Sequence, residues 1–173
     1  MKSITLFLEQ TQTQTTRSRV GVFLIKDNKL ILGDAPNYKY KYFFPGGGLD
    51  PGEDYIKAAI RECKEEIAIV PKNIKLIKHP KNPYKYCGLK KHGFKYDCSE
   101  LIWVTAEVGR IDKSIWGADD GFKVNPIGLT PNETISWLDW CIKETKNLFT
   151  QNTKYKLDLV MVKEIINNGS IKL

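Results

Sequence analysis

The chain has 173 residues, 42% of them hydrophobic, and carries 27 Lys and Arg against 20 Asp and Glu, a net charge of +7. These values are typical of an ordinary soluble protein, and the length predicts one domain with a sizeable core. No apolar run approaches the roughly 18 residues of a membrane span, and too few apolar residues precede Glu9 for a signal peptide, so we expect a cytoplasmic protein.

The N-terminal part of the chain predicts strands. Residues 3–9 alternate apolar and polar side chains, as a short strand does, and the polar stretch after them predicts an edge strand or an arm. Residues 20–34 predict a hairpin, because two apolar runs flank Asp27-Asn28, and both residues tolerate turn conformations.

Residues 38–44 predict an aromatic strand that ends at Pro45. Its rings could stack on a base and its lysines could contact a phosphate. The same pattern fits an alternating strand with solvated lysines and with Tyr40, Tyr42 and Phe44 packed on one face. The candidate substrate-binding residues of this part of the chain are Lys41, Tyr42, Phe44 and Gly46.

Residues 54–67 predict a helix with Asp54 as its N-cap. Apolar side chains recur along it at helical spacing, so they should share one stripe of the helix surface. The members of this stripe are Ile56, Ile60, Cys63 and Ile67.

Two more strands are expected at 73–86 and 99–108, joined by a basic loop. The stretch 81–97 alternates basic and aromatic residues in the manner of a surface for single-stranded nucleic acid. A solvated connection between two strands explains the same pattern, so both interpretations stay open.

The four cysteines predict no disulfide framework, because their spacing fits none and no C-x-x-C pair occurs. They are Cys63, Cys87, Cys98 and Cys141. A zinc site at Cys87, His92 and Cys98, with His79 nearby, is disfavoured because this spacing matches no familiar zinc finger.

The last third of the chain predicts a loop, a strand and two helices. The loop at 109–121 contains Trp116, either as a lid over a substrate or as a plug under the loop. After a strand at 122–129, Thr130 and Glu133 form a capping box for a helix over 131–149. The side of that helix expected to face the core carries Ile135, Leu138, Ile142, Thr145 and Phe149. A final helix is expected to stop near Asn168-Gly169.

Three carboxylates crowd one face of the helix at 54–67. Glu62, Glu65 and Glu66 fall at i, i+3 and i+4, in the last turns, where mutual repulsion and the helix dipole both disfavour them. The arrangement is costly unless a cation lies among them, and ligands that are all oxygen favour Mg²⁺ or Mn²⁺. The rest of the chain is basic, which favours an anionic partner.

The segment before this helix can be held against it. Arg61 lies on the same side of the helix as Glu65 and can fold back to pair with Glu53. The glycines at 46–48 let backbone approach a metal or a phosphate without interference from a Cβ atom.

Together these residues carry a family resemblance. The pattern Gly47-x5-Glu53-x7-Arg61-Glu62-Cys63-x-Glu65-Glu66-x-Ala68-Ile69 resembles the Nudix box, G-x5-E-x7-R-E-U-x-E-E-x-G-U, in which U is a bulky aliphatic residue. The box covers 47–69, and the FPGG lead-in and the IGLTPNE segment extend the resemblance. It implies a Nudix-type α/β/α sandwich with a mixed central sheet, as a single domain at 18–173 after an N-terminal strand or arm at 1–17.

Nudix enzymes cut a pyrophosphate bond in nucleoside diphosphate derivatives with a divalent metal. The resemblance implies that Glu62, Glu65 and Glu66 bind Mg²⁺, with Mn²⁺ as the alternative, and that the carbonyl of Gly46 or Gly47 adds a ligand. One of these carboxylates would orient or deprotonate the attacking water. The residues expected to carry catalysis are Glu65 and Glu66, with Arg61 and Glu53 as the pair that fixes the loop.

The general base in this family can also lie on a later loop. The candidates are Glu107, Asp119, Asp120 and Glu133. Glu133 is also explained as a helix-capping residue, and Asp119-Asp120 as a turn.

Two positions depart from the box. Cys63 replaces an aliphatic residue on the apolar stripe, where a small hydrophobic side chain is tolerable. Ala68 replaces the glycine that ends the helix, and a left-handed alanine costs about 1 kcal/mol. We therefore expect the helix end to shift by one residue, before Pro71, with the carboxylates unaffected.

The leading hypothesis is a pyrophosphohydrolase acting on a nucleoside triphosphate, a nucleotide sugar or a dinucleoside polyphosphate. The first alternative is the same chemistry on 5′-capped RNA, which the basic remainder of the chain favours. The second is a Nudix-like module that senses a nucleotide without cutting it. We expect no membrane partner, and the sequence leaves the oligomeric state open, a dimer included.

Overall fold

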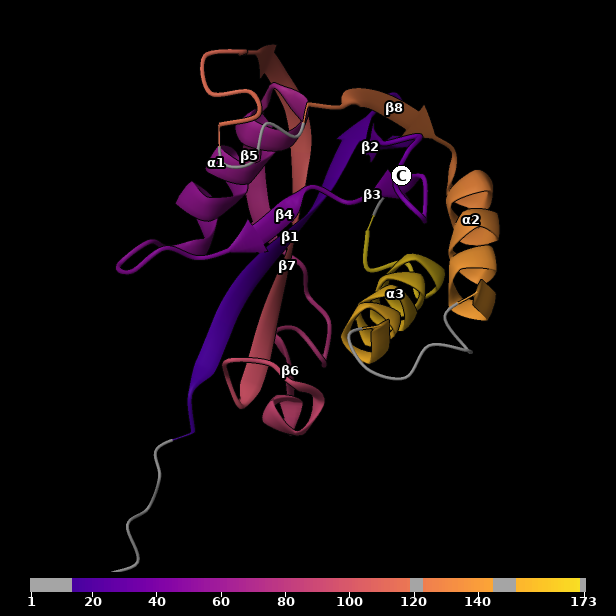
Figure 1. The fold of residues 1–173 in the computed structure, drawn as a ribbon. Helices are drawn as coiled ribbons and strands as arrows, with labels where there is room; N and C mark the ends of the chain where they lie inside the picture. The colour runs from indigo at the N-terminus through magenta and orange to yellow at the C-terminus, as the bar shows by residue number, and fades with distance from the viewer. Residues whose placement is uncertain (1–13, 119–122, 145–151, 172–173) are drawn as a thin grey trace, which may run out of the picture.

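The structure is a computed structural model that describes residues 14–118, 123–144 and 152–171, and it shows one mixed β-sheet with helices on both faces (Figure 1). The strands are β1 (Thr16–Lys26), β2 (Lys29–Asp34), β3 (Tyr42–Phe43), β4 (Gly46–Gly48), β5 (Ile69–Leu76), β6 (Tyr84–Cys87), β7 (Cys98–Ile111) and β8 (Asn125–Leu129). The helices are α1 (Tyr55–Ile67), α2 (Pro131–Glu144) and α3 (Asn152–Asn167), with a short 3-10 turn η1 (Leu89–His92).

Strand β1 lies at the centre of the sheet. It runs parallel to β7, from Thr16 opposite Cys98 to Ile25 opposite Glu107, and every other strand pair is antiparallel. Along its other edge, β1 pairs first with β4 and then with β2. Two strands therefore share this edge of β1, with the short glycine strand β4 along residues 19–21 and β2 along residues 24–26.

The two faces of β1 enter two hydrophobic clusters. Val20, Val22 and Leu24 pack with α1, while Phe23 packs with Trp103, α2 and α3 on the opposite face. The expected α/β/α sandwich with a mixed central sheet is thus confirmed. A strand buried on both faces reads as a nearly continuous apolar run, as residues 20–25 do.

Local sequence explains the ends of several elements. The predicted hairpin is confirmed, and Asp27 and Asn28 both have positive φ, 50° and 58°, as a two-residue turn with right-handed strand twist requires. The Asp54 side chain accepts hydrogen bonds of 2.9 Å from the backbone N–H groups of Ile56 and Lys57 at the start of α1. Thr130 and Glu133 form the predicted capping box of α2.

The expected stripe of α1 is partly wrong. Cys63 and Ile67 are buried, but Ile56 is 41% exposed, and Ala58 and Ala59 take the buried positions instead. Small side chains at these positions let the helix approach the sheet closely. Compared with the expected orientation, the helix is therefore rotated about its axis so that Ala58 and Ala59 are buried.

The aromatic strand expected at 38–44 is reduced to β3. Backbone bonds from Tyr38 to Ala35 and from Lys41 to Tyr38 close tight turns, and Lys41 has a φ of 64°. Tyr40, Tyr42 and Phe44 nevertheless contact the same core cluster, as the alternating-strand interpretation predicted.

The single strand expected at 73–86 is also wrong. It is divided into β5 and β6, which pair with different parts of β7. Pro80 and Pro83 lack a backbone N–H between the two strands. The Asn82 side chain replaces strand pairing there, since it donates to the carbonyls of Ile77 and Trp103 and accepts from the backbone N–H of Trp103.

The expectation that the cysteines form no disulfide is wrong for one pair. Cys87 and Cys98 lie opposite each other in the β6–β7 pairing and are joined by a disulfide, which also excludes them as zinc ligands. Cys63 and Cys141 are buried and form no disulfide with a described residue, and burial raises the pKa of both thiols.

The C-terminal helices largely follow the prediction. Helix α2 buries Thr134, Trp137, Leu138 and Cys141. The predicted face was displaced by one position, because Ile135 and Ile142 are only partly buried. Helix α3 ends at Asn167 and Gly169 has a φ of 70°, as expected.

Some expected features lie outside the described residues. They are the strand at 3–9, Asp119, Asp120, Thr145 and Phe149. Among the helices that the structure describes, none is long and apolar enough to cross a membrane.

Candidate active site

The three predicted carboxylates lie together on α1. Glu62 and Glu65 are 8% and 9% exposed, and Glu66 is partly buried. The backbone of β4 approaches this acidic face so closely that a Cβ atom on Gly47 would collide with the Glu62 carboxylate. Glycine is therefore required at position 47 for space.

Arg61 connects this helix face to the segment before it. Its Nη1 donates to Glu62 Oε1 at 2.9 Å and to Glu65 Oε2 at 3.2 Å. Its Nε and Nη2 bind both Glu53 carboxylate oxygens, at 3.0 and 2.8 Å, and Nη2 also donates to the Gly48 carbonyl at 2.8 Å. One guanidinium thus joins α1, the loop at Glu53 and the glycine strand.

These contacts shift the charge equilibria of the pair. The hydrogen bonds from Arg61 hold the pKa of Glu53 below its ordinary value of 4.5. The same bonds to Glu53 raise the pKa of the Arg61 guanidinium. Both groups stay charged at neutral pH, so the loop is held by a charge-assisted bidentate contact.

Glu66 is contacted by the backbone of the glycine strand. The Gly46 N–H donates to Glu66 Oε2 at 3.0 Å. Gly46 has a φ of 152°, and a Cβ atom there would collide with the Val20 carbonyl oxygen. Glycine at this position lets one backbone N–H reach the carboxylate.

The end of α1 differs from the expectation. The helix ends at Ile67, and Ala68 itself takes the left-handed conformation with φ 57° and ψ 29°. The shifted helix end that we expected is wrong, since Pro71 lies in β5. The Trp116 indole N–H donates to the Glu66 carbonyl at 3.2 Å, so Trp116 packs under its loop and covers the helix end.

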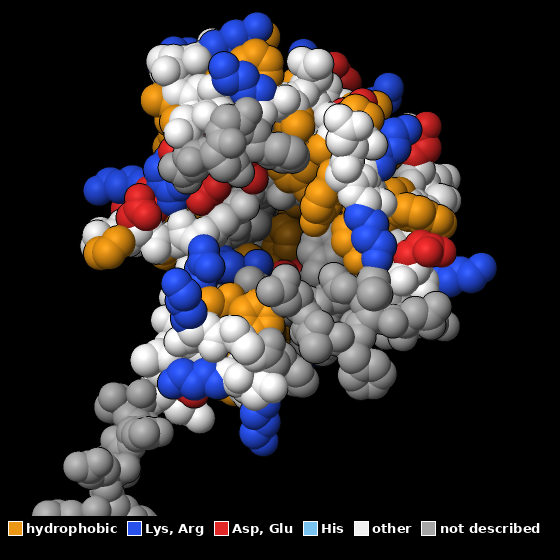
Figure 2. Space-filling model, in the orientation of Figure 1, with side chains coloured by type: hydrophobic (Ala, Val, Ile, Leu, Met, Phe, Trp, Pro, Cys, Tyr) orange, Lys and Arg blue, Asp and Glu red, His pale blue; other side chains and the backbone are white. Residues whose placement is uncertain are grey.

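A cavity of about 440 Å³ opens beside Glu66, between the sheet and α3. Figure 2 shows this hollow with hydrophobic side chains at its floor, Asp and Glu on its α1 side and Lys and Arg on its β6 side. The lining residues on the sheet side include Gly21, Phe44, Gly46, Gly47, Leu101 and Trp103. The cavity is thus mainly apolar, with a carboxylate at one wall, as small-molecule sites generally are.

A second polar group on the cavity wall is an ion pair that sequence reasoning missed. Arg19 Nη2 lies 2.8 Å from Asp158 Oδ2 of α3, and the two side chains are 15% and 12% exposed. Arg19 also donates to Ser99 Oγ and to Tyr86 Oη, both at 3.1 Å. Burial raises the pKa of the Tyr86 hydroxyl above its ordinary value.

The candidate substrate residues separate into two groups. Phe44 and Gly46 line the cavity. Lys41 and Tyr42 do not, because the Lys41 ammonium lies over the Tyr42 ring at 4.9 Å and that ring packs edge-on against Trp137. The lining residues that we did not predict include Arg19, Tyr38, Phe43, Trp103, Asp158 and Val162.

One of the missed residues carried a signal. Arg19 is a charged residue directly before an apolar run that enters the core, so a partner for it was to be expected. Nothing local marks Asp158 or Val162, because α3 reaches the cavity only through the tertiary fold.

The candidate bases outside the box lie elsewhere. Glu107 is 55% exposed, forms an ion pair of 3.8 Å with Lys72, and does not line the cavity. Glu133 accepts from the backbone N–H and hydroxyl of Thr130, at 2.8 Å each, as a capping residue. Of the described carboxylates, Glu66 and Asp158 line the cavity, and Asp158 is paired with Arg19.

The donor set on α1 fits a hard divalent cation by its chemistry. All side-chain donors are carboxylate oxygens on one helix face, which suits Mg²⁺ or Mn²⁺. Within the described ranges, however, no three His, Cys, Asp or Glu side chains converge as a metal cage. Arg61 now supplies the positive charge between Glu62 and Glu65, so the carboxylates must turn towards an ion for it to bind.

In comparisons with known proteins, the chain matches a family model and several curated relatives. The NUDIX domain model matches residues 15–119. An RNA pyrophosphohydrolase of Pelagibacter ubique (strain HTCC1062) is 45% identical over 64 residues, which cover 36% of this chain and 39% of that protein. One of Francisella tularensis subsp. mediasiatica (strain FSC147) is 35% identical over 71 residues, 40% and 45% of the two chains. The matches thus span less than half the length of these curated relatives.

Solved structures share the fold. A crystal structure described as an ADP compounds hydrolase superimposes with a TM-score of 0.55 at 22% identity, covering 90% of this chain and 76% of the other. A NUDIX hydrolase from Nitrosomonas europaea gives 0.53 at 16% identity, covering 85% and 89%. At these identities, the likeness concerns the arrangement of strands and helices alone.

Proposed function

The chain belongs to the NUDIX domain family, and from this premise we propose that it is a divalent-metal-dependent hydrolase that cleaves the pyrophosphate bond of a nucleotide-type substrate. The observation that carries the proposal is the acidic face of α1, where Glu62, Glu65 and Glu66 lie under a glycine strand beside an apolar cavity. The intact carboxylates disfavour a module that only senses nucleotides.

Glu62, Glu65 and Glu66 would hold the metal, with the backbone at Gly47 as a further candidate ligand. When bound, such an ion neutralises diphosphate charge and lowers the pKa of a coordinated water. Of the three carboxylates, Glu66 lines the cavity and is aimed by the Gly46 N–H, so we assign it to orient or deprotonate the attacking water.

Arg61 and Glu53 would act as positioning residues. Their bidentate contact, together with the bond from Arg61 to the Gly48 carbonyl, holds the glycine strand against α1. The strand in turn fixes the Gly46 N–H that orients Glu66. Loss of either partner would therefore loosen the carboxylates without removing one.

We favour an RNA with a phosphoanhydride at its 5′ end as the substrate. Two curated relatives, which match 36% and 40% of this chain, carry the name RNA pyrophosphohydrolase. The surface on the β6 side of the cavity is rich in Lys and Arg (Figure 2), which suits a polyanion. Free nucleotides, nucleotide sugars and dinucleoside polyphosphates are the competing substrates.

The proposal is tested with a panel of these substrates and 5′-triphosphorylated RNA, incubated with Mg²⁺, with products identified by mass. Glu65→Gln and Glu66→Gln should each lower kcat by about 10²–10⁴-fold, the usual contribution of a positioned acid–base group. Glu144→Gln, an exposed carboxylate at the end of α2, is the matched control and should keep its activity.

Two further readouts make the result decisive. Chelation of divalent metal should abolish turnover and added Mg²⁺ should restore it. Unchanged thermal unfolding of the two variants would show that the fold survives. Near-normal turnover by both Glu65→Gln and Glu66→Gln would refute the assignment of the site.

A further inference from the structure

The loop between β6 and β7 is a feature that the proposed hydrolase site does not use. Residues 81–97, which comprise β6, the segment before it and this loop, contain five lysines and one acidic residue, Asp97. Lys90 and Lys81 are paired, with Asp97 and Glu164 respectively, each at 2.9 Å. Lys91 and Lys95 are exposed and form no ion pair with any described residue.

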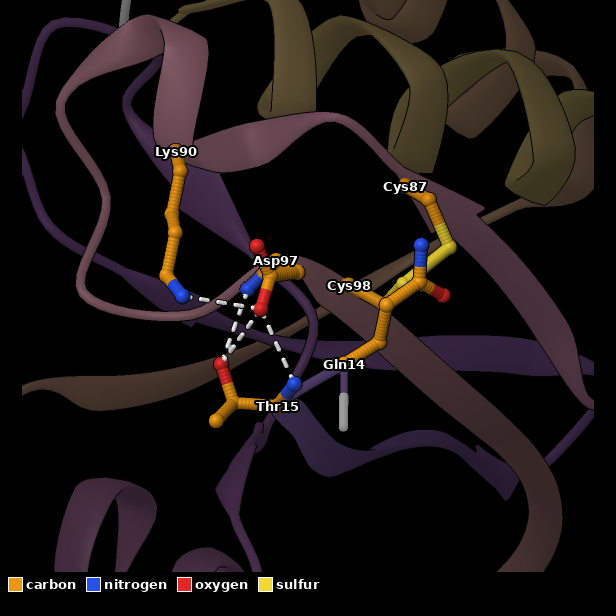
Figure 3. Close-up of a disulfide and its surroundings, with 6 residues drawn as sticks. All are labelled: Gln14, Thr15, Cys87, Lys90, Asp97 and Cys98. Atoms are coloured by element: carbon orange, nitrogen blue, oxygen red, sulfur yellow. Dashed lines mark hydrogen bonds and ion pairs between the residues drawn. A yellow bond between two sulfur atoms is a disulfide. The ribbon is translucent and has the colours of Figure 1, made fainter. Parts of the chain in front are cut away.

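A disulfide and a group of hydrogen bonds around Asp97 hold the loop in place (Figure 3). The Cys87–Cys98 disulfide closes its base. The Asp97 carboxylate accepts hydrogen bonds of 2.9 Å from Lys90 Nζ, from the Thr15 backbone N–H and from the Thr15 hydroxyl. These bonds, that from Lys90 above all, lower the pKa of Asp97 to about 2. Such a loop presents its side chains at fixed positions.

The loop is continuous with the glycine strand through Arg17. The Arg17 guanidinium lies across β4, since its Nη2 would be 2.9 Å from a Cβ atom on Gly48. On its other side Arg17 lies 5.7 Å from the centre of the Tyr96 ring, and that ring is 5.7 Å from the Phe94 ring. A row of cationic and aromatic groups therefore leads from the proposed site to the loop.

We propose that this row, together with the exposed Lys91 and Lys95 of the same loop, forms a basic strip (Arg17, Lys91, Phe94, Lys95 and Tyr96) that binds the single-stranded RNA that follows the 5′-terminal nucleotide. The inference rests on the proposed function, because it places the 5′ end at Glu66. Lysine and arginine contact backbone phosphates, and the rings offer stacking faces to bases, the combination by which proteins hold single strands without reading sequence. An acidic protein would match the lysines but leaves the adjacent rings without a role.

The first test measures binding without hydrolysis. A 5′-hydroxyl single-stranded RNA of about twelve nucleotides, within the usual site size of such surfaces, is titrated by fluorescence anisotropy over a range of salt concentrations. The double variant Lys91→Gln, Lys95→Gln should reduce the slope of log affinity against log salt by about 1.4, from about 0.7 per phosphate contact on a single strand.

The matched control removes the same charge elsewhere. Lys26 and Lys29 are exposed at the turn between β1 and β2, at the far end of β1 from Arg17. Their double change to glutamine should leave the slope unaltered. Tyr96→Leu, which keeps apolar bulk but removes the stacking face, should weaken RNA binding about tenfold, as loss of one stacked base does.

The second test separates this proposal from the proposed function. The ratio of kcat/KM for a long over a dinucleotide 5′-triphosphorylated RNA should fall in the lysine variant and not in the control. If RNA binding depends on the two lysines but no substrate is turned over, the proposed hydrolase function is refuted and the proposal that the basic strip binds RNA is retained. The proposal that the basic strip binds RNA would be overturned if kcat/KM did not depend on RNA length. It would also be overturned if polyglutamate competed for binding as well as RNA does.

Discussion

Ala68 shows how one residue can break a motif and keep its geometry. It stands where the box has glycine, and it still adopts the left-handed conformation that glycine serves. The residue is 4% exposed, so part of the strain is offset by burial. Backbone bonds from the 112–118 loop to α1, such as that from Gly117 to the Glu65 carbonyl at 2.7 Å, hold the helix end in place.

The substitution Ala68→Gly should have almost no effect on the stability of the protein. Relief of the left-handed alanine stabilises by about 1–2 kcal/mol, whereas the lost methyl burial and the more flexible unfolded chain together cost about 1–2 kcal/mol. We expect the free energy of unfolding, measured with denaturant, to change by less than about 0.5 kcal/mol, because the two contributions nearly cancel.

Ala68→Val provides the contrast. A β-branched residue at positive φ is strongly disfavoured, so this change should destabilise by about 2 kcal/mol or more. Equal stability of the glycine and valine variants would contradict a left-handed residue 68.

The β6–β7 hairpin shows what an element gains from a covalent link. Cys87 and Cys98, 11 residues apart, close the loop that carries the basic strip. Chain-entropy estimates for a loop of this length give about 3 kcal/mol of stabilisation. The hairpin can therefore carry an exposed, lysine-rich loop without a core of its own.

Reduction of this disulfide should lower the thermal stability of the protein. A loss of about 3 kcal/mol corresponds to a fall in Tm of roughly 6–12 °C for a chain of this size. Calorimetry with and without a dithiol reductant measures it, and the Cys87→Ser, Cys98→Ser variant should show no further fall. Four reactive thiols in the unreduced, denatured protein would contradict the link.

For the whole molecule, the Arg19–Asp158 pair joins the sheet to α3 across the cavity. It bridges residues 139 positions apart and adds Tyr86 and Ser99 of the hairpin to the same network. Because both side chains are mostly buried, each compensates the charge of the other. The pair therefore couples the position of α3, and thus the shape of the cavity, to the hairpin.

Asp158→Asn should accordingly destabilise the protein by about 2 kcal/mol, below the roughly 3–5 kcal/mol of a fully buried pair because some exposure remains. The control is Asp139→Asn, which breaks the exposed contact with Lys163 and should cost less than about 0.5 kcal/mol. Urea denaturation compares the two, and equal small losses would show that the buried pair does not hold α3.

Spacing along the chain was enough to predict the helix of the box and the residues that contact it. Asp54 as the N-cap, the contact of Arg61 with Glu53 and the crowding of Glu62, Glu65 and Glu66 all follow from spacings of a few residues. Helical geometry converts such spacings directly into positions in space. The same holds for the turn at Asp27-Asn28 and the capping box of α2.

The cavity, the disulfide and the division of the 73–86 segment could not be predicted from local spacing and became clear from the folded structure. Each depends on contacts between different segments of the chain. Arg19 donates a hydrogen bond to Asp158, Cys87 forms a disulfide with Cys98, and Asn82 accepts a hydrogen bond from the backbone N–H of Trp103. Local patterns encode the conformation of a segment, but which segments meet depends on how all their buried faces pack at once.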